Sequence, residues 1–574
     1  MANFPPRPYF APPDHLTIPQ LVFDYEHPTR PARPAGVPCL IDDETGRSVN
    51  LEELRARTNG FAAWLQNVYK LGVDDVVALS SPNHVDYGPV CWGVHETGGI
   101  VAAMSPSLTP NEIEHQFRIA NPKLIIAHPL TIKNIQAALS HLPSITADII
   151  VIGVSHAEAG LRTLDQVLDE ASRQNLVVRR FRLSAGASRS KMAFLCFSSG
   201  TTGKPKAVAL SHYNIVVAVV QLATAQGVND HRLSRDQARF RVGDVSTGVL
   251  PFFHIYGLAV NLHFNLYSGL TTVVTAVFNF EKMLSNIVRY KISTLLIVPP
   301  QATLLVKHPA VKSYDLSHIH CLALAAAALS PEVSTEILKK WPHIHLGQGY
   351  GLTETTGGVT MWPVQPKCGR FGTAGAILPA GEVKVVKLDG TEADLKKGET
   401  GELLVRGPYV ALGYYKDAEA TEKTFLPGGW LASGDEVTLT EDGLLVIVDR
   451  IKEIIKVKGF QVSPNELEGH LLSHPDIADT GVVGVQDDYA GELPVAFVVL
   501  KEGAKQRTKG NVLAEEELKM EVMKHVSDAK SKYKWLKEVF IIPAIPRNPS
   551  GKILRRVLRD DLKAGRYTIT KARL

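Results

Sequence analysis

The segment Phe197–Lys206, Phe-Ser-Ser-Gly-Thr-Thr-Gly-Lys-Pro-Lys, constrains the fold of this chain more than any other feature. It continues the apolar run Met192–Phe197, which predicts a buried strand. Glycines let the backbone turn its N–H groups towards an anion, while hydroxyl and ammonium groups add donors and charge. A buried strand that opens into such a loop is typical of phosphate binding. The spacing excludes a Walker A loop, and the density of donors disfavours a flexible polar linker.

Helical and strand patterns alternate along the first part of the chain. Apolar residues at helical spacing in 51–69 precede short β-branched runs at 75–79, 123–127 and 148–152, and residues 271–298 repeat the strand–helix–strand pattern. This alternation predicts an α/β fold, with a large N-terminal domain of parallel or mixed sheets covered by helices. Ligands of such folds bind at the carboxyl ends of strands, which is where the glycine-rich segment falls.

The pattern changes near residue 449. Residues 453–462 predict a hairpin, and Pro464 is expected at the start of a helix. Further predicted elements are strands at 480–485, 494–500 and 539–542 and a helix at 515–530. The end of the chain is therefore predicted to form a small α+β domain of its own.

Composition and charge exclude several classes of protein. The net charge of +4 comes from 62 basic and 58 acidic residues spread along the chain, which does not indicate nucleic acid binding. Five scattered cysteines lack metal-ligand spacing and indicate reduced thiols in an intracellular protein. No apolar run reaches the length of a membrane-spanning helix.

Further motifs follow the glycine-rich segment in a fixed order. They are Gln348–Glu354 (Gln-Gly-Tyr-Gly-Leu-Thr-Glu), Gly434-Asp435, Asp449–Gln461 and Pro546–Lys552. Together they closely resemble the adenylate-forming superfamily of acyl-CoA synthetases, luciferases and peptide-synthetase adenylation domains, over roughly the whole chain. The stretch Pro251–Gly257 (Pro-Phe-Phe-His-Ile-Tyr-Gly) is most similar to the 4-coumarate:CoA ligase branch.

The resemblance implies an ATP-dependent carboxylic acid:CoA ligase acting on an aryl or arylalkenoic acid. Such an enzyme forms an acyl-adenylate with release of pyrophosphate, then a CoA thioester, and uses ATP, Mg²⁺ and coenzyme A. Alternatives are a medium- or long-chain fatty acyl-CoA ligase, a luciferase-like enzyme and a non-catalytic adenylate binder. An amino-acid-activating domain is disfavoured, because Pro251–Gly257 contains no carboxylate to hold a substrate ammonium.

The resemblance also assigns a nucleotide site. Tyr350 would stack on adenine, Thr353 would contact the α-phosphate, and Glu354 would hold Mg²⁺ together with phosphates and waters. Asp435, paired with Arg450, would bind the ribose hydroxyls. The predicted nucleotide-binding residues are Ser198, Ser199, Gly200, Thr201, Thr202, Gly203, Lys204, Lys206, Gln348, Gly349, Tyr350, Gly351, Thr353, Asp435, Arg450, Lys452, Gly459 and Gln461.

Two lysines are the predicted catalytic residues of the small domain. Lys552 would bridge the attacking carboxylate and the α-phosphate during adenylation, and Lys456 would serve the thioester step from the opposite face. Both would reach one site by domain alternation about a pivot at Lys452. The resemblance therefore divides the chain into a large AMP- and acyl-binding domain (1–448), a hinge (449–453) and a mobile lid domain (454–574).

The acyl pocket is predicted around the Pro251–Gly257 stretch. His254, also a catalytic candidate, would lie near the acyl carboxylate, and the Tyr256 phenol could bond a hydroxylated aromatic acid. The predicted pocket residues are His254, Tyr256, Val260, Ala325, Ala326, Gly349 and Gly351. Alanine replaces the family's usual glycine at Ala325, and one added methyl changes substrate discrimination by about 1–3 kcal/mol. A narrower pocket is therefore expected.

The last three residues, Ala572-Arg573-Leu574, are similar to the Ser-Lys-Leu peroxisomal signal. They predict a peroxisomal protein that binds the import receptor; without such import the protein would be cytoplasmic. The sequence is compatible with a monomer or a homodimer.

Overall fold

The structure is a computed structural model, in which contacts divide the chain into two compact units. The large unit comprises Met1–Leu329, Glu336–Val383 and Leu404–Ala432, and the small unit Ser330–Thr335, Lys384–Leu403 and Ser433–Leu574. The last change from the large to the small unit falls at Ser433. The hinge at 449–453 stays a prediction. The described residues are 8–154, 160–198, 205–327, 329–387, 390–393, 398–451, 453–457, 460–487, 490–530, 532–548 and 551–567, with only the backbone described for Lys456, Phe460 and Gln461.

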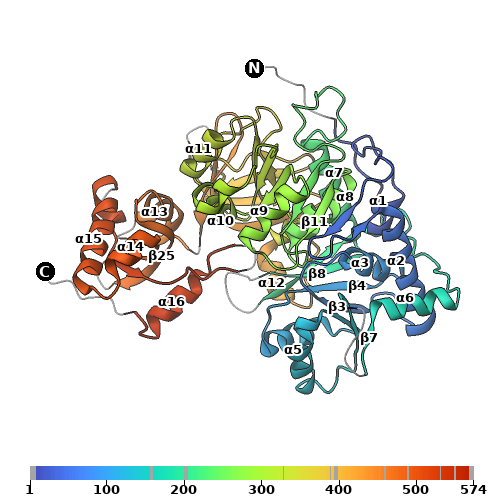
Figure 1. The fold of residues 1–574 in the computed structure, drawn as a ribbon. Coiled ribbons are helices and arrows are strands. Elements are labelled where there is room, and N and C mark those ends of the chain that lie inside the picture. The colour runs from blue at the N-terminus through green and yellow to red at the C-terminus, as the bar shows by residue number, and fades with distance from the viewer. Residues whose placement is uncertain are drawn as a thin grey trace. The chain divides into compact units, whose positions relative to one another are not determined.

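The glycine-rich segment follows a strand of a sheet with eight strands in the described part of the chain (Figure 1). Its inner strands are parallel, whereas β8 and β9 form an antiparallel hairpin in which Ser198 pairs with Lys206. The loop therefore begins at the carboxyl end of a buried strand, as predicted. The strand order is β19 (Gly413–Tyr414), β9 (Lys206–Ser211), β8 (Met192–Ser198), β4 (Ile100–Met104), β3 (Val76–Ser80), β5 (Leu124–Ala127), β6 (Asp148–Val151) and β7 (Arg162–Thr163).

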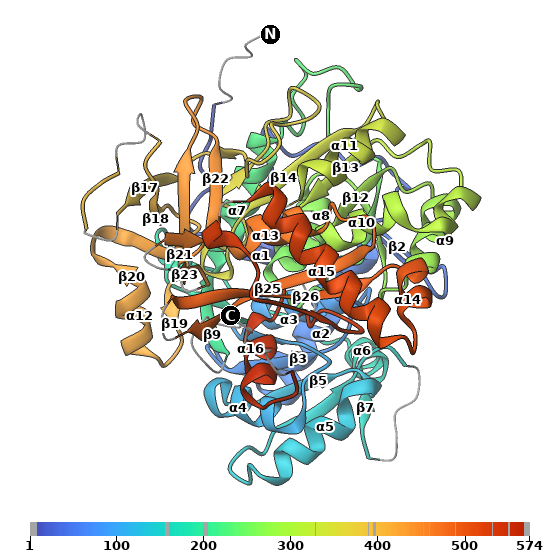
Figure 2. The same ribbon diagram turned by 90° about the vertical axis from the view of Figure 1, so that its left-hand side faces the viewer.

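Helices cover both faces of this sheet, because alternate residues of its strands point to opposite sides. Val77 and Leu79 pack with helices α2 (Leu51–Trp64), α3 (Tyr87–Glu96) and α6 (Leu164–Arg173). Ala78 packs on the other face, with α4 (Pro110–Ala120) and α5 (Pro129–Ser140), which lie beside one another in Figure 2. The inner strands of this sheet are rich in buried β-branched residues because helices cover both of their faces.

A second sheet of the large unit has nine strands among the described residues. Strands β14 to β1 run parallel, and antiparallel strands extend both edges. Helix α7 (His212–Ala225) packs its Val216, Val219 and Val220 against one face, while α9 (Phe280–Arg289), α10 (Pro299–Lys307) and α11 (Pro331–Lys340) connect or follow its strands. The order is β16 (Ala376–Ile377), β15 (Thr360–Met361), β14 (His345–Tyr350), β13 (Cys321–Leu324), β12 (Thr294–Ile297), β10 (Val245–Gly248), β11 (Thr271–Val274), β1 (Leu40–Asp42) and β2 (Ser48–Val49).

A smaller antiparallel arrangement positions the predicted ribose-binding residues. Strand β21 (Trp430–Leu439) pairs with β22 (Leu445–Arg450), and a register shift lies between Glu436 and Val437. The remaining strands of this sheet are β17 (Glu382–Val386), β18 (Gly401–Arg406) and β20 (Phe425–Leu426).

The end of the chain forms a sheet between helices, as the sequence predicts. Its strands are β24 (Phe460–Val462), β23 (Ile455–Val457), β26 (Gly491–Leu500), β25 (Ile477–Asp487) and β27 (Glu538–Ile541). Val482 packs on one face with α13 (Pro464–Leu471) and α15 (Val512–Ala529), and Val483 packs on the other with α16 (Arg555–Lys563). Strands β23 and β24 form the predicted hairpin, in which Lys456 pairs with Gln461 along the backbone.

The α/β sheets of the large unit, covered by helices, and the small α+β region confirm the predicted fold class. Within the described residues, no helix has both the length and the apolar character needed to cross a membrane.

Candidate active site

Glu354 is the centre of a compact polar group in the large unit. It lies on the short 3-10 turn η5 (Thr353–Thr355), just after β14. Its Oε1 atom accepts hydrogen bonds from Ser198 Oγ at 3.1 Å and from the Tyr414 hydroxyl at 3.0 Å. Ser198 ends β8 and Tyr414 ends β19. Two strands of one sheet therefore aim hydroxyl groups at a single carboxylate oxygen.

Lys206 joins this group from the start of β9. Its Nζ atom lies 4.8 Å from the centre of the Tyr414 ring, a cation–π contact. Burial and the nearby charge of Glu354 raise the pKa of Tyr414 above its ordinary value, so the phenol remains a hydrogen-bond donor. Two predicted phosphate ligands, Ser198 and Lys206, are thus brought beside the predicted metal ligand. The others of this loop, Ser199, Gly200, Thr201, Thr202, Gly203 and Lys204, lie outside the described residues.

The glycines around Tyr350 are required by close backbone approach. A Cβ atom at Gly349 would lie 3.0 Å from the Thr360 carbonyl oxygen, and one at Gly351 would lie 2.1 Å from the Gly357 carbonyl oxygen. Both residues sit where β14 turns back towards β15. Tyr350 and Thr353 are partly exposed, as an adenine-stacking ring and a phosphate contact require.

Gln348 has a structural bond at each end of its amide. Its Oε1 atom accepts from the Leu329 backbone N–H at 2.7 Å, and its Nε2 atom donates to the Thr373 carbonyl at 2.9 Å. These bonds tie the segment after β13 to β14. Any contact of Gln348 with a nucleotide remains a prediction.

The residues present fit a magnesium ion held mainly by substrate. In the described part of the chain, no group of three or more His, Cys, Asp or Glu side chains could hold a metal ion by itself. One carboxylate, Glu354, bonds Ser198 and, through Tyr414, is linked to Lys206, both of which are predicted to bind phosphate. Mg²⁺ commonly takes one or two carboxylates and fills its remaining positions with phosphate oxygens and water. When bound, the ion would neutralise charge on the phosphates.

His254 is held as a neutral donor. Burial lowers the pKa of its imidazole to about 4. Its Nδ1 atom accepts from the Tyr256 backbone N–H at 3.3 Å, so the neutral ring carries its proton on Nε2. The turn that makes this contact needs glycine at its end, because a Cβ at Gly257 would lie 2.1 Å from the Pro251 carbonyl oxygen.

The predicted acyl-pocket residues fall on neighbouring elements. Tyr256 donates to the Ala323 carbonyl of β13 at 3.3 Å and packs in one apolar cluster with Val260. Ala325 is partly exposed and Ala326 is exposed. The backbone of Ala326 has a φ of 73°, which costs a non-glycine residue about 1 kcal/mol or more. The Tyr256 proton already has an acceptor, so this phenol offers a substrate only its oxygen lone pairs.

Asp435 and Arg450 form the predicted pair in the small unit. They are opposite residues of β21 and β22, and Arg450 Nε lies 3.1 Å from Asp435 Oδ1. Asp435 is buried, and Arg450 is partly exposed. The turn before Asp435 is fixed by Gly434, whose φ is 72° and whose N–H donates to Glu402 at 3.0 Å.

Lys552 lies within electrostatic range of this pair. Burial lowers the pKa of its ammonium to about 8, and the charge of Arg450 contributes in the same direction. Asn548 fixes its backbone, because Asn548 Oδ1 accepts from the Lys552 N–H at 2.8 Å. Lys552, Asp435 and Arg450, predicted from separate motifs, are thus brought together. Lys452 and Gly459 lie outside the described residues, as do the side chains of Lys456 and Gln461.

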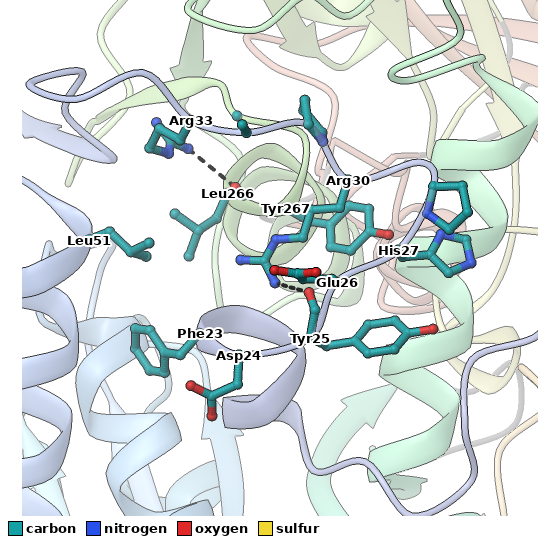
Figure 3. A pocket seen from close by; sticks show the side chains of 14 residues that line it. Phe23, Asp24, Tyr25, Glu26, His27, Arg30, Arg33, Leu51, Leu266 and Tyr267 are labelled. Atoms are coloured by element: carbon teal, nitrogen blue, oxygen red, sulfur yellow. Dashed lines mark hydrogen bonds between the residues drawn. The ribbon is translucent and has the colours of Figure 1, made fainter.

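A cavity of about 660 Å³ lies elsewhere in the large unit, between the start of the chain and α8 (Asn265–Tyr267) (Figure 3). Arg30 donates to carbonyls at the end of α1 (Ile18–Phe23) and to Tyr25, and Arg33 donates to Pro38, Leu266 and Leu270. These guanidinium groups cap helix ends. None of the predicted site residues that the structure describes lines this cavity.

Tyr414 is the site residue that sequence reasoning missed. It lies in a strand of two residues, Gly413–Tyr414, too short to show a pattern. The only local signal is Gly413, whose φ is 135°.

Comparison with known proteins decides the family. A model of the AMP-binding enzymes matches residues 28–415, and a model of the AMP-binding enzyme C-terminal domain matches 466–552. The chain belongs to the AMP-binding enzymes. As a member of this family it is an AMP-forming acid:CoA ligase, and its nucleotide is ATP.

Several curated relatives of this AMP-binding enzyme match nearly end to end. A 4-coumarate–CoA ligase of Pinus taeda is 34% identical over 557 residues, 96% of each chain. A probable CoA ligase of Humulus lupulus is 35% identical over 527 residues, 91% of this chain and 89% of the relative. Among solved structures, an anthranilate CoA ligase in complex with anthranoyl-AMP has a TM-score of 0.81 at 23% identity, covering 97% of this chain and 99% of the other, and so supports the fold.

Proposed function

We propose that this ligase activates an aryl or arylalkenoic acid similar to 4-coumarate. The observation that carries the proposal is the identity of about a third, over nearly the whole chain, to 4-coumarate–CoA ligases from several plants. The similarity of Pro251–Gly257 to that branch supports it. The acid would lie with its carboxylate near His254 and its ring in the cluster formed by Tyr256 and Val260.

In the proposed first step, a carboxylate oxygen of the acid attacks the α-phosphorus of ATP. The bond from that phosphorus to the bridging oxygen breaks, and pyrophosphate leaves with the electron pair. Ser198 and Lys206 would hold the departing phosphates, and Lys552 would reduce repulsion between the carboxylate and the α-phosphate. Glu354 would hold Mg²⁺ beside them.

In the proposed second step, the thiolate of coenzyme A attacks the acyl carbon and AMP leaves with the electron pair of the acyl–oxygen bond. The thiol proton passes to solvent. Lys456, Gly459 and Gln461 are proposed for this step from the family resemblance, together with a movement of the small domain about Lys452.

The proposal is tested by pyrophosphate release with ATP and Mg²⁺ across a panel of acids, with and without CoA. The panel contains coumaric, cinnamic, benzoic and phenylacetic acids and fatty acids from C6 to C16. We expect an aromatic acid to release pyrophosphate and to form its CoA thioester. Release with fatty acids alone would instead identify a fatty acyl-CoA ligase. If none of the acids gives pyrophosphate release, the protein would be an adenylate binder without catalytic activity.

We propose a peroxisomal location on the basis of Ala572-Arg573-Leu574, which lie outside the described residues. A fluorescent fusion that leaves these residues at the end should collect in peroxisomes. The same fusion with Leu574→Asp should stay in the cytoplasm, and an unchanged distribution would refute the signal.

A further inference from the structure

Tyr414 contacts two oppositely charged groups of the nucleotide site with different parts of one side chain. Its hydroxyl donates to Glu354 Oε1 at 3.0 Å, and its ring lies under the Lys206 ammonium, 4.8 Å from the ring centre. No described residue donates a hydrogen bond to the other Glu354 oxygen, Oε2. That oxygen is the one left for a cation.

The Tyr414 side chain is itself firmly held. Strand β19 pairs with β9 so that Tyr414 lies opposite Val208, and the Tyr414 N–H donates to Thr421 Oγ1 at 3.0 Å. Phe425 packs edge-on against the ring, with the two ring centres 5.5 Å apart. Because backbone and ring are both fixed, the direction of the hydroxyl and of the ring face is fixed too.

Opposite charges such as those of Glu354 and Lys206 attract each other. Within the described chain, however, Glu354 and Lys206 form no ion pair, and Tyr414 contacts both. A direct pair would occupy the carboxylate that must meet a metal and the ammonium that must meet phosphate. Tyr414 instead offers Glu354 a neutral hydroxyl and Lys206 an aromatic ring face, which are weaker partners than an opposite charge. A metal ion at Glu354 or a phosphate at Lys206 can replace these interactions or add to them.

We propose that Tyr414 is a positioning residue for the magnesium–triphosphate site, holding Glu354 through its hydroxyl and Lys206 through its ring. This proposal rests on the proposed assignment of Glu354 to magnesium. It predicts that the hydroxyl and the ring have separable effects, the first on metal affinity and the second on phosphate affinity. Groups that orient a metal ligand typically change metal affinity about 10- to 100-fold when removed.

The test is ATP binding by calorimetry across a range of Mg²⁺ concentrations, without acid or CoA, so that no turnover occurs. Tyr414→Phe removes only the hydroxyl, and Tyr414→Leu removes the aromatic ring as well. We expect Tyr414→Phe to raise the Mg²⁺ concentration that supports half-maximal binding about 10-fold while metal-independent ATP binding is unchanged. Tyr414→Leu should weaken metal-independent binding in addition.

Tyr415→Phe is the matched control, because Tyr415 contacts Lys416 rather than Glu354; it should behave as the unmodified enzyme. Glu354→Gln distinguishes a failure of the magnesium assignment from a failure of the role proposed for Tyr414. If Glu354→Gln keeps the full Mg²⁺ dependence, the magnesium assignment fails and this proposal with it. If Glu354→Gln loses that dependence but Tyr414→Phe does not alter it, the role of Tyr414 alone is refuted. Equal losses in metal-dependent and metal-independent binding by Tyr414→Phe, with a lower melting temperature, would show a purely structural role and overturn it.

Discussion

Asp435 and Arg450 face each other across two antiparallel strands and form an ion pair, with Arg450 Nε 3.1 Å from Asp435 Oδ1. The pairing fixes the carboxylate as an acceptor and the guanidinium as a donor for neighbouring hydroxyls. The register of β21 and β22 sets the distance between two residues that belong to separate sequence motifs.

Replacing Asp435 by Asn should therefore weaken ATP binding. The amide keeps the shape but loses the charge that holds Arg450 and strengthens bonds to the ribose, an effect of about 1.5–3 kcal/mol. We expect an increase in the Kd for ATP of about 10- to 100-fold, measured by calorimetry. Binding of 2′,3′-dideoxy-ATP, which lacks the ribose hydroxyls, should change much less, and an equal loss for both nucleotides would contradict the ribose assignment.

Adenylation should weaken at alkaline pH through Lys552. Its pKa of about 8 means that the ammonium loses its proton, and its attraction for phosphate, as pH rises through about 8. We expect kcat/KM for ATP in pyrophosphate release to fall above that pH, since this constant reports the unliganded enzyme. Lys552→Arg keeps its charge to higher pH, so any activity it retains should lack this alkaline fall.

Arg450→Met offers an independent check on the same ammonium. The Arg450 charge helps to lower the pKa of Lys552, so its removal should move the alkaline fall to higher pH. A fall that stays in place, despite lower activity, would mean that another group titrates there.

The two lysines should separate the two half-reactions. Lys552→Ala should abolish acid-dependent pyrophosphate release yet leave CoA transfer from preformed acyl-adenylate largely intact, because only in the first step does a carboxylate approach the α-phosphate that Lys552 is proposed to neutralise. Lys456→Ala should do the reverse. Single-turnover assays of each step decide the matter, and loss of adenylation alone in both variants would exclude the two-conformation mechanism.

Local patterns predicted several of the helices and strands and several residues of the candidate site. The runs at 124–127 and 295–297 are recognisable because helices bury both faces of their sheets, which favours apolar residues in them. Ser198, Lys206 and Glu354 were predictable because each lies in a motif of the family. Tyr414 was not, because it meets Glu354 from 60 residues further along the chain and its strand is only two residues long. Nor could the sequence show that Gln348 is tied to the backbone at both ends.

His254 should act without changing its charge. Burial lowers its pKa to about 4, so the ring is neutral from pH 6 upwards and donates through Nε2. His254→Ala should lower the adenylation rate without moving the acid side of the pH–rate profile. Because the folded pKa lies below the ordinary 6.5, the folded chain binds this proton less readily than the unfolded chain, and the stability contributed by neutral His254 is lost as pH falls from 6.5 towards 4.

Arg555 should be essential to the small unit's stability. Its guanidinium bonds Glu468 at 2.8 Å and Asn465 at 2.8 Å and pairs with Glu453, and Arg555 and Glu468 are both buried. Removing one partner of a buried ion pair leaves an uncompensated charge and typically costs about 3–5 kcal/mol. Arg555→Met should therefore lower the free energy of unfolding of this unit by several times more than Arg556→Met, at an exposed position of the same helix.

Urea denaturation followed by hydrogen exchange can assign that loss to the small unit. The double variant Arg555→Met with Glu468→Leu should recover part of the stability, because it removes the stranded carboxylate along with its partner. Glu453 would remain, so recovery should be incomplete. If the double variant is as unstable as the sum of its single changes, the two side chains do not interact energetically, and the stability of this region must come from its apolar clusters instead.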